Sequence, residues 1–146
     1  LCATSAFCLP ERESLPRFKA ETEALADAIH SGEGWLSMYI FWELRLLEET
    51  GLGLDLKACA NGGRANDLAY VSPRTGRAVS RMGAGEWADR LLPLPECLLG
   101  GPVTLEGARA ALTLTGHFLS QHLAPSLGSR PLPAARTRFV EQVARV

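Results

Sequence analysis

The sequence lacks a long uninterrupted apolar run and a basic leader. Its most apolar stretch, Trp35 to Leu47, contains Glu43 and Arg45 and is shorter than the roughly 20 apolar residues of a membrane-spanning helix. The first residue is Leu1, and Leu1 to Leu9 has neither the basic start nor the length of a secretion signal. These absences predict a soluble domain. Because Leu1 to Leu9 resembles the end of an apolar helix, we also expect that further chain precedes it.

Cysteine and histidine are few and scattered. The cysteines are Cys2, Cys8, Cys59 and Cys97, and their spacing is not that of a disulfide-stapled scaffold, so we expect no disulfides. We expect Cys2 and Cys8 to be small core residues. Besides His30, the histidines are His117 and His122, which lie about 140° apart around a regular helix and should not converge on a metal.

The sequence also lacks a recognisable catalytic constellation. Cys59 has no local nucleophile signature and no assignable histidine partner. Glu48 and Glu49 are adjacent and point apart on a helix, and we expect them, like Glu43, to lie at a solvated helix edge. The loop 61–64 has glycines but not the Lys-Ser/Thr ending of a phosphate-binding loop. We therefore predict a protein that is not an enzyme and needs no cofactor.

What is present is the composition of one globular domain over residues 1–146. Hydrophobic residues make up 47% and charged residues 21%. Apolar residues recur at helical spacing in several segments separated by glycine, proline or polar residues. We predict a first helix that ends at Leu9, a second from Pro16 to Ser31, and a third from Trp35 to Leu47 at the centre of a bundle. A fourth runs from Thr104 to about His122 and is stopped by Ala124-Pro125. A last helix is predicted near Ala135 to Val143. A short polar linker is expected at 11–16.

The helical period disappears between Asp55 and Met82. Residues 68–71 and 77–80 are short strand candidates, and the segment from Ser72 to Gly76 between them has proline early and glycine last, as in a turn. A short helical turn is expected at 86–92, and 93–102 is expected to be irregular or briefly helical. The predicted fold is therefore mainly α, a helical bundle with one small β-hairpin inserted at about residues 55–82.

Positive charge is concentrated in the second half of the chain. Residues 1–63 carry five Lys/Arg and ten Asp/Glu, whereas residues 64–146 carry ten arginines and six acids. Arg74, Arg77 and Arg81 lie on or beside the hairpin, near Tyr70, and a basic hairpin with a stackable ring suits nucleic acid. Two alternatives stay open. In the first, the charges only prevent edge-to-edge association of the hairpin. In the second, arginine is frequent because a GC-rich genome favours its codons.

Several segments together indicate a family. They are Leu9 to Glu13, Phe41 to Leu47 leading into Glu49 to Cys59, Leu68 to Ser80, and Arg130 to Arg136. In this order they resemble the C-terminal helical domain of the RecO family of bacterial recombination mediators and DNA repair proteins. The resemblance covers nearly the whole chain and is most specific from Trp42 to Ser80. An OB-fold precedes this domain in the family, and no β-rich segment of that kind is found in this sequence.

The resemblance implies a non-catalytic, cytoplasmic, nucleoid-associated protein. Members of the family bind single- and double-stranded DNA, mainly through the OB-fold, and anneal strands. With RecR they help to load RecA, as in RecFOR-type repair, and they bind the acidic, Phe-ended tail of the single-strand-binding protein. No membrane contact is implied. An alternative is a helical scaffold or regulator without a nucleic-acid role.

The resemblance also bears on metal. Many members hold zinc with a Cys-x-x-Cys on each side of the hairpin, and this sequence has Cys59, Gly62, Ser80 and Gly83 at those positions. One thiolate cannot replace four ligands, so a zinc-free version is expected, its hairpin held by packing of Tyr70, Val71 and Val79.

A tail that ends in Phe with a free carboxylate needs an apolar slot beside a cation. Arg45, flanked by Phe41 and Leu44, is the predicted cation, with Arg130 and Arg136 brought near it by the bundle. Equally open is that Arg45 only pairs with Glu48 or Glu49 at the helix edge.

Overall fold

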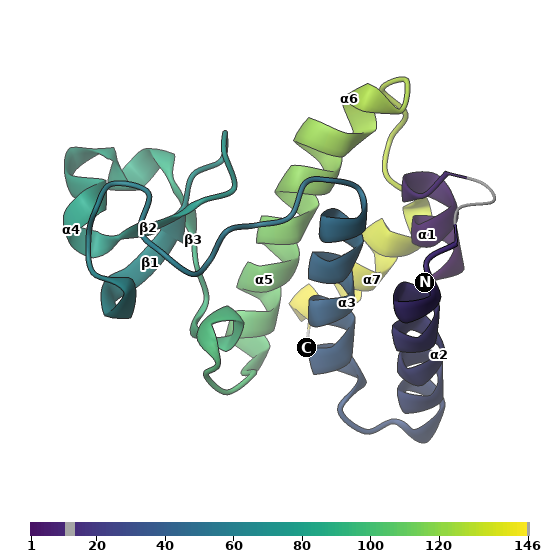
Figure 1. The fold of residues 1–146 in the computed structure, drawn as a ribbon. Helices are drawn as coiled ribbons and strands as arrows, with labels where there is room; N and C mark the ends of the chain where they lie inside the picture. Colours follow the sequence, from purple (N-terminus) through teal and green to yellow (C-terminus); the bar gives the residue numbers. More distant parts are fainter. Residues whose placement is uncertain (11–13, 146) are drawn as a thin grey trace.

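A computed structural model describes residues 1–10 and 14–145. The linker expected at 11–16 therefore falls largely outside the described residues. Helices form one body, and a small sheet-bearing lobe lies to one side of it, at the left of Figure 1. The main helices are α1 (Cys2–Cys8), α2 (Pro16–Ser31), α3 (Trp35–Glu49), α5 (Leu105–Phe118) and α7 (Ala134–Arg145). This confirms the mainly α fold.

Helix α3 occupies the centre of the bundle, as predicted from its wide apolar surface. It packs against α2 on one side and α5 on another, while α7 packs against α5 and α1. Ile40, Leu46 and Leu47 of α3 are fully buried, whereas Met38 and Phe41 of the same helix remain exposed. In the described residues, no helix combines the length and the apolar character needed to cross a bilayer.

The helix boundaries follow local chemistry. Pro16 occupies the first turn of α2, where a missing N–H costs no hydrogen bond, and Gly32 ends that helix with a φ of 81°. The Thr104 hydroxyl caps α5 by accepting a hydrogen bond from the Gly107 N–H. The predicted stop at Ala124-Pro125 is wrong, because the helix continues through a π-helical turn, η4 (Leu119–Leu123), into α6 (Ala124–Ser126).

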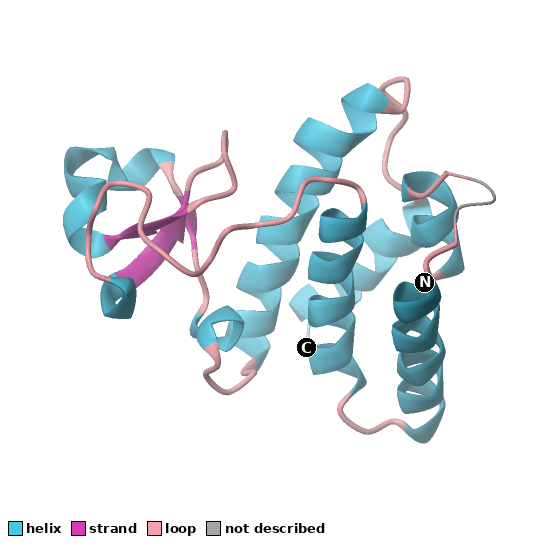
Figure 2. Ribbon diagram, in the orientation of Figure 1, coloured by secondary structure: helices cyan, strands magenta, loops and turns pink. Residues whose placement is uncertain are grey.

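The lobe contains the predicted hairpin, with β1 (Leu68–Val71) antiparallel to β2 (Ala78–Ser80). A third strand, β3 (Leu92–Pro93), pairs with the other edge of β1, so the sheet order is β2-β1-β3 (Figure 2). This strand was not predicted, because two residues that include a proline show no strand period. The lobe thus extends beyond the expected range 55–82.

Short helical turns complete the lobe. They are η1 (Ala65–Asp67), α4 (Arg81–Ala84), η2 (Gly85–Arg90) and η3 (Glu96–Leu99). The 3₁₀ turn η2 confirms the turn expected near 86–92. Val71 and Val79 are buried, as predicted for a sheet held by packing, and Tyr70 is half-buried.

Candidate functional site

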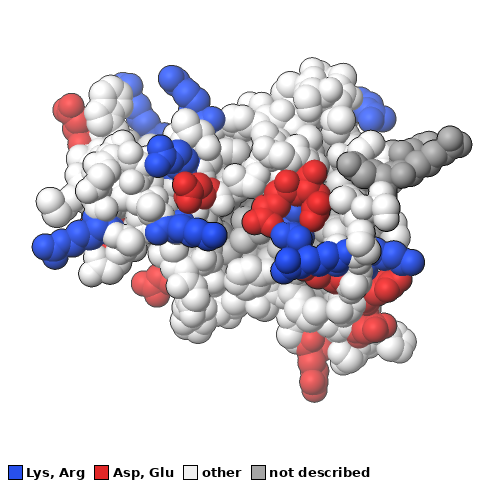
Figure 3. Space-filling model, in the orientation of Figure 1, with Lys and Arg blue, Asp and Glu red and all other residues white. Residues whose placement is uncertain are grey.

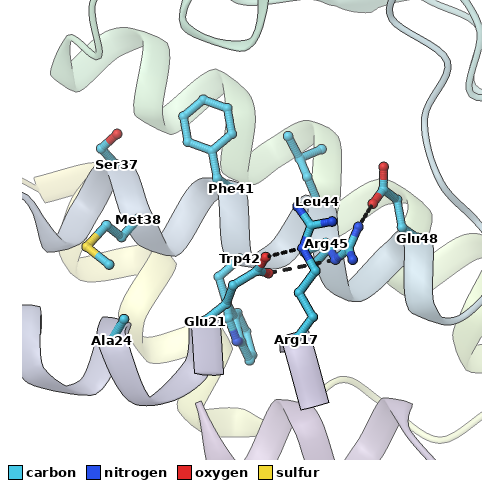
Figure 4. Close-up of a pocket in the computed structure, with 10 residues that line it drawn as sticks. All are labelled: Arg17, Glu21, Ala24, Ser37, Met38, Phe41, Trp42, Leu44, Arg45 and Glu48. Carbon is cyan, nitrogen blue, oxygen red and sulfur yellow. Dashed lines mark hydrogen bonds and ion pairs between the residues drawn. The ribbon is translucent and has the colours of Figure 1, made fainter. Parts of the chain in front are cut away.

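A groove of about 560 Å³ lies between α2 and α3. We call it the α2–α3 groove. It holds three residues of the predicted tail site, Phe41, Leu44 and Arg45 (Figure 4). The other residues that line it are Arg17, Glu21, Ala24, Ser37, Met38, Trp42 and Glu48.

One wall of the groove is apolar and accessible. Phe41 is 46% exposed although it is flanked by buried residues of α3, and Met38 beside it is also exposed. Below them, the Trp42 ring stacks on Phe18 at a centroid distance of 5.5 Å, and its Nε1 donates a hydrogen bond to the Thr22 hydroxyl at 2.8 Å. The groove therefore offers an exposed aromatic surface above a buried, hydrogen-bonded indole.

Carboxylates surround the predicted cation of the groove. Arg45 Nη1 donates to Glu48 at 2.6 Å, and its Nε lies 3.2 Å from Glu49 and 3.7 Å from Glu21. The helix-edge pairing kept open from the sequence is therefore present. Arg17 from α2 is more accessible, with a side chain 75% exposed and an ion pair to Glu21 at 3.2 Å. A bound anion would meet Arg17 first.

Arg136, also expected at the tail site, lies elsewhere. Its side chain is only 6% exposed, with Nε and Nη2 donating to the two carboxylate oxygens of Glu43 at 2.7 and 2.9 Å. Arg136 therefore does not line the predicted tail site, because Glu43 already neutralises its charge inside the bundle. Arg130 stays at the surface, 5.5 Å from the Phe7 ring, and does not line the α2–α3 groove.

Glu43 was expected at a solvated helix edge, and this prediction is wrong. Its side chain has no exposed surface. Besides Arg136, it accepts hydrogen bonds from the Tyr39 hydroxyl at 2.9 Å and from the Thr115 hydroxyl. Glu43 follows Ile40 by three residues and precedes Leu47 by four, so it shares their buried face. That spacing is the sequence signal that could have placed it in the core.

The three hairpin arginines are exposed, as a nucleic-acid surface requires. Arg77 and Arg81 flank β2 at its two ends, roughly 13 Å apart in an extended chain, and Arg74 lies in the turn. Arg77 lies 3.8 Å from Asp55, and Arg81 lies 3.5 Å from Asp67. On the face in Figure 3, basic side chains project from several points of the sheet-bearing lobe, with acidic ones between them.

A more exposed aromatic ring than Tyr70 lies in η2 and was not predicted from the sequence. Trp87 in η2 is 54% exposed, and the Arg90 guanidinium lies over its ring at 4.8 Å from the centroid. Residues three apart eclipse one another in a 3₁₀ helix, so Trp87 and Arg90 share one side while Glu86 and Asp89 share another. An exposed indole beside an arginine is a sequence-tolerant platform for a nucleobase.

Of the four positions that the resemblance assigns to zinc, Cys59, Ser80 and Gly83 come together, and Cys59 alone of these carries a zinc-binding side chain. The Cys59 thiol lies 3.4 Å from the Ser80 hydroxyl, which accepts a hydrogen bond from the Gly83 N–H at 2.9 Å. A Cβ added at Gly63 would collide with the same hydroxyl, whereas one at Gly62 would meet open space. The Ser80 hydroxyl therefore occupies the space between Cys59, Gly63 and Gly83. Across the described residues, no three or more His, Cys, Asp or Glu side chains are placed to share a metal.

We expect no tightly held zinc at Cys59. The domain, passed over a chelating resin, should contain no stoichiometric zinc by elemental analysis, and EDTA should leave its melting temperature unchanged, because a single sulfur cannot build a structural site. One zinc per chain that survives the resin, supports stability and is lost in Cys59→Ser would contradict this.

The four cysteines are free, and Cys2 is exposed rather than in the core as expected. Hydrogen bonding from Ser80 lowers the pKa of the buried Cys59 thiol to about 7. Nothing places a histidine beside it: His117 and His122 both bond to the Pro73 carbonyl oxygen, and His30 lies on α2. Cys59 is therefore paired with Ser80 and not with a histidine.

The fold and its surfaces define a helical domain with a small three-stranded lobe and an apolar, partly cationic groove. Residues 1–131 match the family described as "Recombination protein O C terminal". The chain belongs to this family, which confirms the resemblance seen in the sequence.

Relatives named DNA repair protein RecO agree with this assignment. The chain is 56% identical over 143 residues to that of Dinoroseobacter shibae and 56% identical over 146 residues to that of Cereibacter sphaeroides strain ATCC 17029, covering 98% and 99% of this chain. It spans 59% and 61% of the lengths of these relatives. No solved structure matches this chain.

Proposed function

We propose that this chain is the interaction domain of a non-catalytic DNA repair and recombination mediator. Membership of the RecO C-terminal family carries the proposal, together with the name of its relatives, DNA repair protein RecO. In this proposal the domain binds the tail of the single-strand-binding protein, contributes auxiliary contacts to single- and double-stranded DNA, and acts with RecR in loading RecA.

The α2–α3 groove supports tail binding. A terminal Phe ring fits the exposed wall of Phe41 and Met38, and the adjacent carboxylate fits the guanidinium groups of Arg17 and Arg45. Glu21 and Glu48 oppose the tail's acidic residues, and the tail carboxylate must displace a glutamate already paired to Arg45, so most of the affinity must come from the apolar contact. The ion pair between the tail carboxylate and the guanidinium groups of Arg17 and Arg45 should weaken as salt is added.

Titration of a labelled tail peptide tests this function. The domain alone should bind it, and Arg17→Ala and Arg45→Ala should each weaken binding roughly three- to tenfold, the range expected for exposed charged contacts. Phe41→Ala should weaken it as well. Arg138→Ala, which removes an exposed charge on α7, is the matched control and should bind as the wild type does.

Two outcomes would count against this assignment. Equal affinities for the wild type and the groove variants would move the tail away from the α2–α3 groove. Failure of the wild-type domain to bind the peptide would remove the tail site from this domain altogether.

The lobe supports an auxiliary DNA contact, through phosphate binding by Arg74, Arg77 and Arg81 and base stacking on Trp87. In the full-length protein, the triple alanine variant of these arginines should flatten the salt dependence of single-strand binding by up to about two units of slope, at roughly 0.7 per phosphate contact. Trp87→Ala should weaken binding at all salt concentrations, because stacking releases few counterions.

A charge-matched control removes three exposed cations from the bundle, Lys19, Arg138 and Arg145. This variant should keep the wild-type salt slope if the contact lies on the lobe. An unchanged salt slope in the lobe variant, or an equal loss of slope in the lobe and control variants, would mean that the lobe arginines serve solubility and not DNA binding.

A further inference from the structure

Two histidine side chains meet one backbone oxygen where the sheet-bearing lobe touches the bundle. Nε2 of His117 lies 3.2 Å from the carbonyl oxygen of Pro73, and Nε2 of His122 lies 2.7 Å from the same oxygen. The two ring centroids are 5.8 Å apart, and both residues are partly exposed. Pro73 lies in the turn between β1 and β2, so the cluster joins the two parts of the molecule.

The π-helical turn explains why the sequence-based expectation of divergent rings is wrong. In a regular α-helix, residues five apart point about 140° away from each other. In η4, the Ala124 N–H donates to the Leu119 carbonyl, five residues back. This wider turn brings positions five apart toward the same side of the helix, and such turns are frequent at functional sites.

We propose that His117, His122 and the Pro73 carbonyl oxygen form a binding site for a divalent transition metal ion of the Zn²⁺ or Ni²⁺ type. With bonds of about 2.0–2.2 Å and angles between about 90° and 110°, neighbouring ligand atoms lie about 2.8–3.6 Å apart. The two nitrogen–oxygen separations of 2.7 and 3.2 Å are close to this range. Imidazole suits these ions, and water fills the remaining positions.

The protons balance without an acid or base. In the metal-free form, each neutral imidazole donates its Nε2–H to one of the two lone pairs of the carbonyl oxygen. In the metal-bound form, each Nε2 lone pair coordinates the ion and the single proton of each ring resides on Nδ1. Each neutral ring carries one proton before and after the ion binds, so the exchange is balanced.

Two imidazoles and a carbonyl make an exchangeable site rather than a closed structural one, which usually has four protein ligands. The chelating resin used for the Cys59 test would therefore empty it. Its effect is mechanical: the ion ties the turn at Ser72 to Gly76 to the end of α5. Because Arg74 follows Pro73 directly, this fixes the lobe, and the cations it carries, against the bundle.

Calorimetric titration of the resin-treated chain with Zn²⁺, and separately with Ni²⁺, tests the site. We expect one ion per chain and a raised melting temperature, since an ion that binds only the folded state stabilises it. His117→Gln and His122→Gln, whose amides can still donate to the Pro73 carbonyl, should each lower the affinity at least about tenfold.

His30→Gln is the matched control, because His30 is exposed on α2, and it should bind as the wild type does, as should Cys59→Ser. Circular dichroism confirms that each variant is folded. Absence of binding to the wild type, binding that His122→Gln leaves unchanged, or binding lost in Cys59→Ser would each overturn the proposal.

Discussion

Trp42→Ala should destabilise the domain by about 3–5 kcal/mol, the usual cost of truncating a buried aromatic side chain. Trp42 is 3% exposed, and its ring contacts Phe18 and Tyr39 at centroid distances of 5.5 and 5.6 Å. The variant also leaves the Thr22 hydroxyl without its indole donor. In a chain of this size, such a loss lowers the melting temperature by roughly 10–20 °C.

Trp87→Ala provides the matched control for this experiment. The same atoms are removed, but from a ring that is largely exposed on the lobe, so the free energy of unfolding should change by no more than about 0.5 kcal/mol. Urea unfolding of both variants decides the matter. If the two substitutions cost the same, Trp42 is not part of the bundle core.

Arg136→Ala should be as damaging, because it leaves Glu43 buried without its cation. Removing one partner of a buried ion pair typically costs about 3–5 kcal/mol. The pair is held by two hydrogen bonds, and the Leu112 carbonyl oxygen also accepts from Arg136 at 3.0 Å. Arg138→Ala, two residues away and exposed on the same helix, should have little effect.

A double variant separates the charge from the packing. Glu43→Leu with Arg136→Met replaces the pair by apolar side chains of similar length, so it should recover much of the stability lost in Arg136→Ala. Thermal unfolding of the single and double variants measures this. If the double variant is as unstable as the single one, the lost stability comes from packing at Arg136 and not from an uncompensated charge.

The sequence was sufficient for features that depend on local spacing. The apolar period located α2, α3, α5 and α7, and the Pro73 to Gly76 turn located the β1–β2 hairpin. Proline at the start of α2 and threonine before α5 marked helix ends because both act through the nearest backbone groups. The family resemblance was equally visible, because its segments are continuous in the chain.

Features that depend on tertiary contact were missed. Glu43 and Arg136 are 93 residues apart, and no periodicity pairs them. The convergence of His117 and His122 requires the π-helical turn. The extra residue in that turn does not alter the local sequence pattern in a recognisable way. In the α2–α3 groove, the pairing of Arg45 with Glu48 and Glu49 was visible as i, i+3 and i, i+4 spacing. The contribution of Glu21 and Arg17 required the packing of α2 on α3.

The three tryptophans allow a direct test of where the tail binds. Trp42 lines the α2–α3 groove, Trp35 lines a separate pocket beside Phe139, and Trp87 lies on the sheet-bearing lobe. Each gives its own indole N–H resonance in a ¹⁵N-labelled domain, assigned with Trp35→Phe and Trp87→Phe variants.

The decisive measurement is the titration of that labelled domain with the acidic, Phe-ended tail peptide. Tail binding in the α2–α3 groove should shift the Trp42 indole resonance to saturation while those of Trp35 and Trp87 stay in place. A shift of Trp35 or Trp87 with Trp42 unmoved, or no shift at saturating peptide, would contradict tail binding in the α2–α3 groove.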